Sequence, residues 1–432
     1  MKLAVISDTH LGDPLCTLVE QKGSGFAAGV MYDKFKEASG INNDYLILLG
    51  DILDFSVASY ENAYKAGKTF FSLIKKDNIA DQIIYVPGNH DYDIWSVVEY
   101  EVNIIYQIKH GRLPRKFRMA VPGIIDDRGN SPQRGFTLPG VEKRTGGYYS
   151  YGGLFLDSIT RNYDNKSNSI EGGNSHFVFA YPDIYLVNDD ESVLMTHGQY
   201  LESYWSLLSE WAPRIFKSDL PLGSEMDIAE LVGINFPFNQ LACSGVGQAG
   251  VLSAVISELQ SQIKKGDVKK AKKYLDNLDN YLDKNVFDYN KWYQFIDEAL
   301  TDLISNKVKE KIVDLISSQK DTRYNEKFFD NLEVRKRFMN YYQACLAELN
   351  NLKSLYNVSI PVPRKAIFGH THQPIPLNDR DVPEMPVSGN STVKLYNTGG
   401  WLWKEEENKK VFCGAEVFKY ETGVGFSSVS IR

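Results

Sequence analysis

Cysteine is scarce in this sequence, and the few cysteines lie far apart along the chain. Only four occur in 432 residues, and no Cys-x-x-Cys pair is present. This scarcity disfavours a disulfide framework and a thiolate zinc site. We therefore expect free, mostly buried thiols, as in a reducing compartment, at Cys16, Cys243, Cys345 and Cys413.

Long apolar runs are also missing. The run that follows Met1-Lys2 ends at Ser7 after four residues, which is too short for the hydrophobic region of a signal peptide. No run approaches the roughly 20 apolar residues that a membrane-spanning helix needs. We expect a cytoplasmic protein without a transmembrane segment.

The sequence also lacks an excess of positive charge, since its formal net charge is -7. Affinity for nucleic acid depends on Lys and Arg side chains that neutralise phosphates, so nucleic acid is a disfavoured partner, although a local cationic pocket stays compatible with this charge. The composition, 43% hydrophobic and 24% charged, is that of a globular protein with a substantial core. Nothing in the sequence indicates an oligomeric state.

The chain is long for one simple domain, and its N-terminal part alternates between two patterns. Continuous apolar runs at residues 3–6, 45–49 and 83–86 predict strands that are covered on both faces. Between them, residues 30–39 and 63–75 carry apolar side chains at helical spacing. This alternation predicts an α/β fold.

The pattern changes beyond Asp91, after which a helix is expected. Residues 122–175, rich in Gly, Ser, Asn and Tyr, predict a long irregular excursion, and loops of such length are usually functional or mobile. Residues 225–356 are helical in pattern, so we expect residues 206–356 to form an α-helical insertion. Further strands are expected at residues 177–180, 184–187, 192–196, 365–368, 393–396, 411–420 and 426–431.

Metal-competent side chains follow five of the apolar runs. Carboxylates, amide oxygens and imidazoles are the ligands of hard and borderline divalent cations. Five of the seven histidines lie at these run ends, whereas His110 and His176 do not. One such histidine alone would be most simply structural, but the set predicts a metal centre at strand ends. The polar residues at these ends are Asp8, His10, Asp51, Asn89, His90, His197, His370 and His372.

Two of these run ends carry a pair of metal-competent residues at the same spacing. Asp8 and His10 are two residues apart, as are His370 and His372, so in an extended backbone both members of a pair point to the same side. Asp51 follows a glycine, which permits close approach of the backbone.

The ordered motifs resemble the signature of the calcineurin-like metallophosphoesterase superfamily. They are Asp8-x-His10, Gly50-Asp51-x-x-Asp54, Gly88-Asn89-His90-Asp91, His197 and Gly369-His370-x-His372. The resemblance implies an αββα sandwich, in which two mixed sheets are flanked by helices. It covers a core of residues 1–205 and 357–432, with residues 206–356 as the insertion and a candidate cap.

The resemblance also implies two divalent metal ions, with Mn, Fe, Zn and Ni all compatible with such mixed ligands. A hydroxide between the metals would attack phosphorus in line. His90, held by Asp54, would stabilise the phosphoryl oxygens or protonate the leaving group. The first metal would be held by Asp8, His10, Asp51 and His372, and the second by Asp51, Asn89, His197 and His370.

Asp54 and Asp91 each have a second interpretation. A carboxylate beside an imidazole favours the protonated, acidic form of the ring, which suits a pairing of Asp54 with His90. The alternative is that Asp54 caps the next helix. Asp91 is a candidate for a supporting role next to the ligands, with helix capping as the alternative.

The implied activity is hydrolysis of a phosphomonoester or phosphodiester of a small or medium organic molecule, with nucleotides and nucleotide-linked lipids or sugars as candidates. Phe55-Ser56 stands where protein serine/threonine phosphatases have Arg-Gly, which disfavours phosphoprotein substrates. The alternatives are a nuclease and a non-catalytic scaffold that retains the fold. The candidate phosphate or base contacts are Tyr92, Trp95, Lys143, Arg144 and Arg161.

Overall fold

The computed structural model describes residues 1–132, 134–143, 149–152, 177–202, 205–206, 209, 226–247, 324–387, 391–406 and 409–432. Several expectations lie outside these residues. They concern His176, the candidate contacts Arg144 and Arg161, most of the second half of the 122–175 excursion, and the middle of the helical insertion.

The first sheet has six strands in the order β17-β16-β1-β4-β5-β8. β1, β4, β5 and β8 are parallel, whereas β16 pairs antiparallel with both β1 and β17. The carboxyl ends of the parallel strands therefore lie at one edge. The bounds are β1 (Lys2–Ile6), β4 (Asn43–Leu49), β5 (Ala80–Val86), β8 (Phe177–Phe179), β16 (Ala415–Glu421) and β17 (Gly425–Ile431).

The second sheet has seven strands in the order β12-β13-β11-β10-β9-β6-β7. β10, β11 and β13 are parallel, so the residues that follow them also share an edge. The bounds are β6 (Gly123–Asp126), β7 (Gly135–Thr137), β9 (Asp183–Val187), β10 (Ser192–Thr196), β11 (Lys365–Phe368), β12 (Glu384–Val387) and β13 (Ser391–Asn397).

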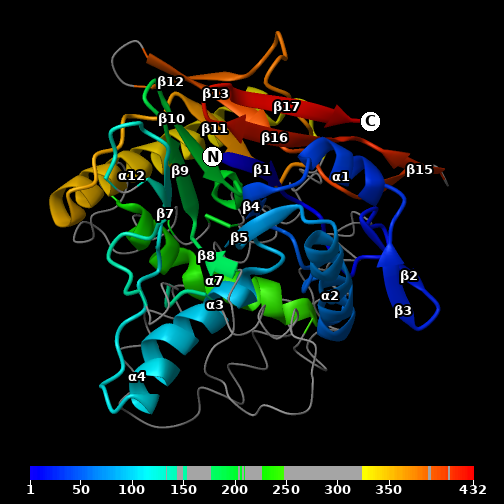
Figure 1. The fold of residues 1–432 in the computed structure, drawn as a ribbon, viewed down its shortest axis with the longest axis horizontal. Coiled ribbons are helices and arrows are strands. Elements are labelled where there is room, and N and C mark those ends of the chain that lie inside the picture. Colours follow the sequence, from blue (N-terminus) through cyan, green and yellow to red (C-terminus); the bar gives the residue numbers. More distant parts are fainter. Residues whose placement is uncertain are drawn as a thin grey trace, which may run out of the picture.

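Helices lie on the outer sides of the two sheets (Figure 1). The first group is α1 (Tyr32–Ser39), which contacts β16 and β17, and α2 (Tyr60–Lys76). The second is α7 (Ile228–Gly247), which packs on α3, and α12 (Leu332–Tyr356), which contacts β12. α3 (Tyr92–Tyr100) continues through a π-helix (Glu101–Ile105) into α4 (Tyr106–Lys109).

Local sequence explains why α2 begins and faces as it does. Ser59 is its N-cap and accepts a hydrogen bond from the Asn62 amide, which satisfies one of the first free N–H groups. Ala63, Phe70 and Ile74 are buried on one face. None of the helices in the described ranges is long and apolar enough to cross a membrane.

The predicted α/β class with two mixed sheets flanked by helices is confirmed. Two local expectations were wrong. The segment 122–175 is not irregular throughout, because β6 and β7 lie in its first part and extend the second sheet. The single strand expected at residues 411–420 is split between β15 (Lys409–Phe412) and β16, at Gly414, whose φ of 110° breaks the strand.

Two short hairpins contain strands that were not expected. β2 (Val19–Lys22) pairs with β3 (Gly25–Ala28), neither of which was expected, and the unexpected β14 (Trp403–Glu406) pairs with β15. Their strands are only four residues long, and a period-2 pattern is weak over so few positions. The domain boundaries placed at residues 205 and 357 stay a prediction.

Candidate metal centre

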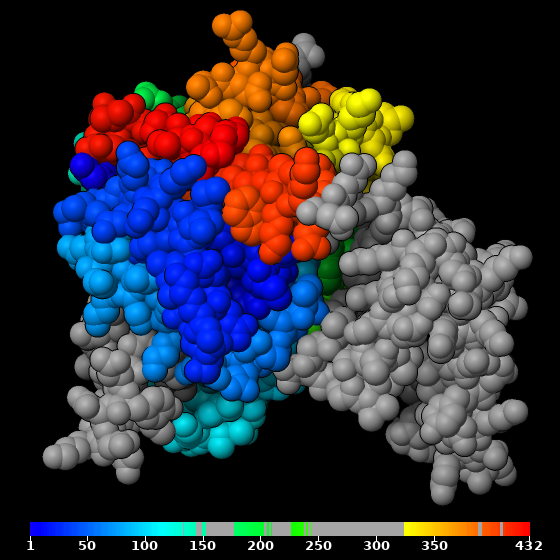
Figure 2. All heavy atoms as spheres, turned by 90° about the vertical axis from the view of Figure 1, so that its right-hand side faces the viewer, coloured from blue at the N-terminus to red at the C-terminus, as the bar shows by residue number. Residues whose placement is uncertain are grey.

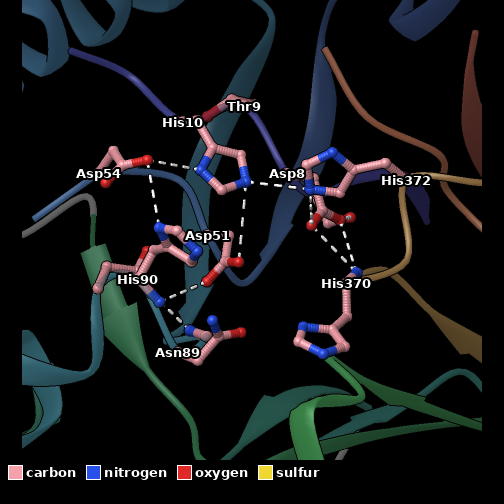
Figure 3. A network of polar contacts seen from close by, with 12 residues as sticks. Asp8, Thr9, His10, Asp51, Asp54, Asn89, His90, His370 and His372 are labelled. Carbon is pink, nitrogen blue, oxygen red and sulfur yellow. Dashed lines mark hydrogen bonds and ion pairs between the residues drawn. The ribbon is translucent and has the colours of Figure 1, made fainter. Parts of the chain in front are cut away.

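The polar residues that follow the parallel strands of both sheets meet in one place (Figure 3). Their backbone is not extended, as the two-residue spacing had suggested. Non-glycine residues with positive φ occur in the turns after β1, β4 and β11, and such strained backbone gathers at functional sites. The φ angles are 51° at Asp8, 45° at His10, 53° at Asp51, 68° at His370 and 53° at His372.

The first group of ligand atoms comes from Asp8, His10 and His372, all of which are buried. The Nε2 atoms of His10 and His372 lie 3.1 Å apart, and Asp8 Oδ1 lies 3.2 Å from His372 Nε2. Asp8 is held by the backbone N–H of His370, at 3.0 and 2.9 Å from its two oxygens, and by the Ser7 hydroxyl. Two imidazole nitrogens and a carboxylate oxygen thus converge on one point.

The second group comes from Asp51, His197 and His370, with Asn89 beside them. His197 Nδ1 donates to the Leu49 carbonyl at 3.0 Å, which directs Nε2 toward Asn89 Oδ1 at 3.1 Å and Asp51 Oδ2 at 3.3 Å. A backbone carbonyl that orients one ring nitrogen leaves the other for a metal, as in known metal sites.

His370 is buried, and within the described residues neither of its ring nitrogens makes a hydrogen bond of good geometry. A buried polar side chain in that condition calls for an explanation such as an ion. Together with the facing nitrogens of His10 and His372, this ring shows that the donors present fit divalent cations of the kind that imidazole and carboxylate bind.

Asp51 lies between the two groups. Its Oδ2 atom is 3.8 Å from His10 Nε2 and 3.3 Å from His197 Nε2, while Oδ1 accepts the backbone N–H of His90 at 2.8 Å. The preceding residue, Gly50, has φ of 86°, and a Cβ there would lie 2.3 Å from the His197 ring. The expected close backbone approach before Asp51 is therefore present.

The charges of the two groups stabilise one another. Burial raises the pKa of Asp8, but attraction to His372 and a hydrogen bond with it outweigh burial and hold that pKa below its usual value. Burial acts in the same sense on Asp51, and attraction chiefly to His197 holds its pKa well below the usual range. Burial lowers the pKa of His197, yet attraction to Asp51 raises it to about 9.

Asp54 contacts imidazoles and does not cap the next helix, because the N-cap of α2 is Ser59. Its Oδ1 atom accepts the backbone N–H groups of Ser56 and Val57, at 3.0 and 2.7 Å, and so closes the turn that precedes α2. Its Oδ2 atom lies 2.8 Å from His10 Nδ1 and 3.2 Å from His90 Nδ1. Asp54 therefore contacts two imidazoles, and not His90 alone as the sequence had suggested.

Asp91 joins the ends of β4 and β5. Its Oδ2 atom accepts the Ile52 N–H at 2.8 Å and the Tyr85 hydroxyl at 2.5 Å, and Oδ1 accepts the Gly88 N–H at 2.5 Å. Burial, and then repulsion by Asp51, raise the pKa of Asp91 to about 6. Asp91 supports the two loops that carry Asp51 and Asn89.

Residues outside the motifs also reach the centre. Glu202 Oε2 lies 3.2 Å from His370 Nε2, the Ser56 hydroxyl lies 2.6 Å from His90 Nδ1, and the Tyr324 hydroxyl lies 3.5 Å from His372 Nδ1. Asn397, the last residue of β13, donates to the Gly369 carbonyl at 2.7 Å. Only Asn397 carries a sequence signal, because it directly follows the strand predicted at residues 393–396.

Some candidates are placed away from the centre. Tyr92 and Trp95 are fully buried in the core, where Trp95 stacks on Tyr181, so neither contacts a substrate. Lys143 lies over the Tyr149 ring. His110 is exposed at the end of α4, as its separation from the strand ends had indicated.

A family model described as calcineurin-like phosphoesterase matches residues 1–220, which include every motif up to His197. A comparison with curated proteins gave no match. The matched segment is half of the chain and contains β1, β4, β5 and β10, whose ends carry Asp8, Asp51, Asn89 and His197. The chain therefore belongs to the calcineurin-like phosphoesterase family.

Proposed function

We propose that this protein is a dinuclear metal-dependent hydrolase that acts on a phosphomonoester or phosphodiester of a small or medium organic molecule. Nucleotides and nucleotide-linked lipids or sugars are the candidate substrates. The observation that carries the proposal is the position of Asp51, one oxygen of which faces His10 in one ligand group and His197 in the other. A carboxylate so placed can serve two ions at once.

The proposed ligand sets are supported by the two groups of buried ligand atoms. When bound, divalent ions in these positions would lower the pKa of a water molecule and polarise the phosphoryl oxygens. The donors are imidazole, carboxylate and one amide, which suit Mn, Fe, Zn or Ni. The first ion would be held by Asp8, His10, Asp51 and His372, and the second by Asp51, Asn89, His197 and His370.

His90 is the residue that we assign to the substrate. Its side chain is 18% exposed, whereas those of His10 and His197 are 1% and 0% exposed. Asp54 and Ser56 occupy Nδ1, so Nε2 is the atom that would donate a proton to the departing oxygen or contact the phosphoryl group. The buried carboxylate of Asp54 favours the protonated ring that this donation needs.

A cytoplasmic location is part of this proposal. It is supported by the four free cysteines, three of which are buried. Free thiols persist where glutathione and thioredoxin keep them reduced.

The test is turnover by protein loaded separately with Mn, Fe, Zn or Ni. We expect hydrolysis of bis(p-nitrophenyl) phosphate or p-nitrophenyl phosphate, two bound ions by elemental analysis, and loss of both in Asp51→Asn. The matched control is His110→Asn, at an exposed histidine outside the centre, which should retain metal and activity. Two bound ions without turnover of any ester, including cyclic nucleotides and nucleotide sugars, would instead support the scaffold.

A further inference from the structure

The helical segment that begins beside the metal centre ends in an exposed tip. It starts at Tyr92, directly after the loop of His90 and Asp91, and runs through the π-helix to Lys109. At 1.5 Å per residue its length is about 27 Å. We call Ile105 together with residues 108–116 the tip; every one of these residues is exposed.

The tip lies apart from the two sheets. In Figure 1, α4 and the turn that follows it lie at the lower left, away from both sheets. In Figure 2, the cyan atoms of this part of the chain form the lowest part of the coloured surface.

Large apolar side chains of the tip are exposed to solvent. Leu113 is 87% exposed, Ile108 59% and Ile105 45%. Tyr100, further along the same helical segment, is 48% exposed, and the step of five residues from Tyr100 to Ile105 spans the π-helix, whose hydrogen bonds join residues five apart. Single exposed apolar residues are ordinary, but several on one short exposed segment favour an interaction surface.

Positive charge is interspersed with these apolar side chains. The tip contains Lys109, Arg112, Arg115 and Lys116, and residues 102–125 contain no Asp or Glu, in a chain with a net charge of -7. Among the described residues, the one ion pair of these four is Arg112 with Glu142, at 4.0 Å. The tip is therefore a local cationic surface on an acidic protein.

We propose that the tip binds the surface of an anionic phospholipid bilayer. Basic side chains alone would suit any polyanion, because their attraction is to phosphate charge. The exposed Leu113 and Ile108 decide between the partners, since apolar side chains gain free energy by entering the acyl boundary and gain little against a nucleic-acid backbone. Basic residues flanking exposed Leu and Ile are the composition of interfacial membrane anchors.

Lipid binding at the tip is separable from catalysis. The tip and the metal centre lie at opposite ends of one helical segment, so the bilayer contact needs none of the proposed metal ligands. The proposal goes beyond the proposed hydrolase function, and it would hold the enzyme at a membrane surface with its metal centre intact.

The test is sedimentation of the full-length protein with vesicles. We expect binding to vesicles of equal parts phosphatidylcholine and phosphatidylglycerol, weakened by salt, and no binding to phosphatidylcholine alone. Charge reversal in Lys109→Glu/Lys116→Glu should weaken binding at least about tenfold, as expected for two basic residues near an anionic surface. Ile108→Ser/Leu113→Ser should weaken it as well, through loss of apolar insertion.

The controls use residues of matched exposure. Lys68→Glu/Lys75→Glu reverses two exposed lysines of α2 and should leave vesicle binding unchanged. All variants should keep the circular dichroism spectrum and the turnover of p-nitrophenyl esters. Equal binding to both vesicle types, undiminished binding by both tip variants, or equal loss in the α2 variant would overturn the proposal. Tip-dependent binding to a duplex oligonucleotide, with vesicle binding independent of the tip, would assign the tip to nucleic acid instead.

Discussion

The proton donor is the part of the proposed mechanism that one substitution can isolate. His90→Asn removes the imidazole and keeps an amide that can still contact Asp54. A positioned general acid contributes about 10²–10⁴-fold to the rate, or about 2.7–5.4 kcal/mol of transition-state free energy at 1.36 kcal/mol per tenfold. This contribution is needed only where the leaving oxygen departs as a strongly basic alkoxide.

The structure indicates why the contribution should be large. The His90 ring lies 3.2 Å from Asp54 Oδ2, and Asp54 is fully buried. Burial raises the pKa of Asp54, but attraction to His90 and the contacts with His10 and His90 outweigh it and hold the pKa far below its usual value. Asp54 is therefore ionised at neutral pH, and its charge favours the protonated form of the ring.

The assay compares two leaving groups on the same enzyme. With an alkyl phosphodiester, His90→Asn should lower kcat at least about 10²-fold, whereas with bis(p-nitrophenyl) phosphate the loss should be below about tenfold, because p-nitrophenolate departs without a proton. Metal content should stay unchanged, since His90 belongs to neither proposed ligand set. An equal loss with both esters would refute the acid role and leave stabilisation of the phosphoryl oxygens.

Three further outcomes are expected. In the metal-free protein His197 has a pKa of about 9, so metal binding at about pH 7.5 should release a proton from its ring, and the affinity for metal should rise with pH up to about 9. Calorimetry in two buffers of different ionisation enthalpy measures the number of protons released, and zero release would contradict the prediction. Glu202→Gln should weaken binding of the second ion about 10–100-fold and leave binding of the first unchanged, because Glu202 lies 3.2 Å from His370. Titration with elemental analysis measures both affinities, and equal affinity for both ions in the variant would refute this. Burial raises the pKa of Asp183 from 3.8 to about 7. Its contribution to the free energy of unfolding is therefore complete below pH 3.8 and declines as the pH rises to about 7, by up to about 4 kcal/mol. Asp183→Asn, whose amide oxygen can still accept from Tyr341, should therefore raise the free energy of unfolding at about pH 8 and not at about pH 4, measured by urea denaturation; equal effects at both pH values would contradict the buried charge.

Asp54 shows how far local sequence reaches. The sequence allowed either a pairing with His90 or a cap on the next helix, and both are short-range possibilities. The structure shows the contact with His90, gives the helix cap to Ser59, and adds a second imidazole, His10, 44 residues earlier in the chain. No local pattern distinguishes one imidazole from two, because the distance between them depends on the pairing of β1 with β4.

Glu202 and Tyr324 are residues near the metal centre that local sequence does not predict. Neither follows a predicted strand, and Tyr324 reaches His372 from 48 residues away. An apolar run that stops at a polar residue is readable in one window of sequence, whereas a side chain that arrives from a distant segment has no such signature. The tip is intermediate, since its lysines and arginines are visible in the sequence and their exposure beside Ile108 and Leu113 is not.

The sequence by itself determined the α/β class, most of the strands and the chemical types of the metal-competent residues, because strand formation and ligand preference depend on neighbouring side chains. Tertiary structure alone decided which of these residues share a point in space. The pairing of β10 with β11 joins Leu194 to Ala366, and only that pairing brings His197 and His370 to one edge of the sheet. Convergence across such separations is set by packing of the whole core, which no short stretch of sequence encodes.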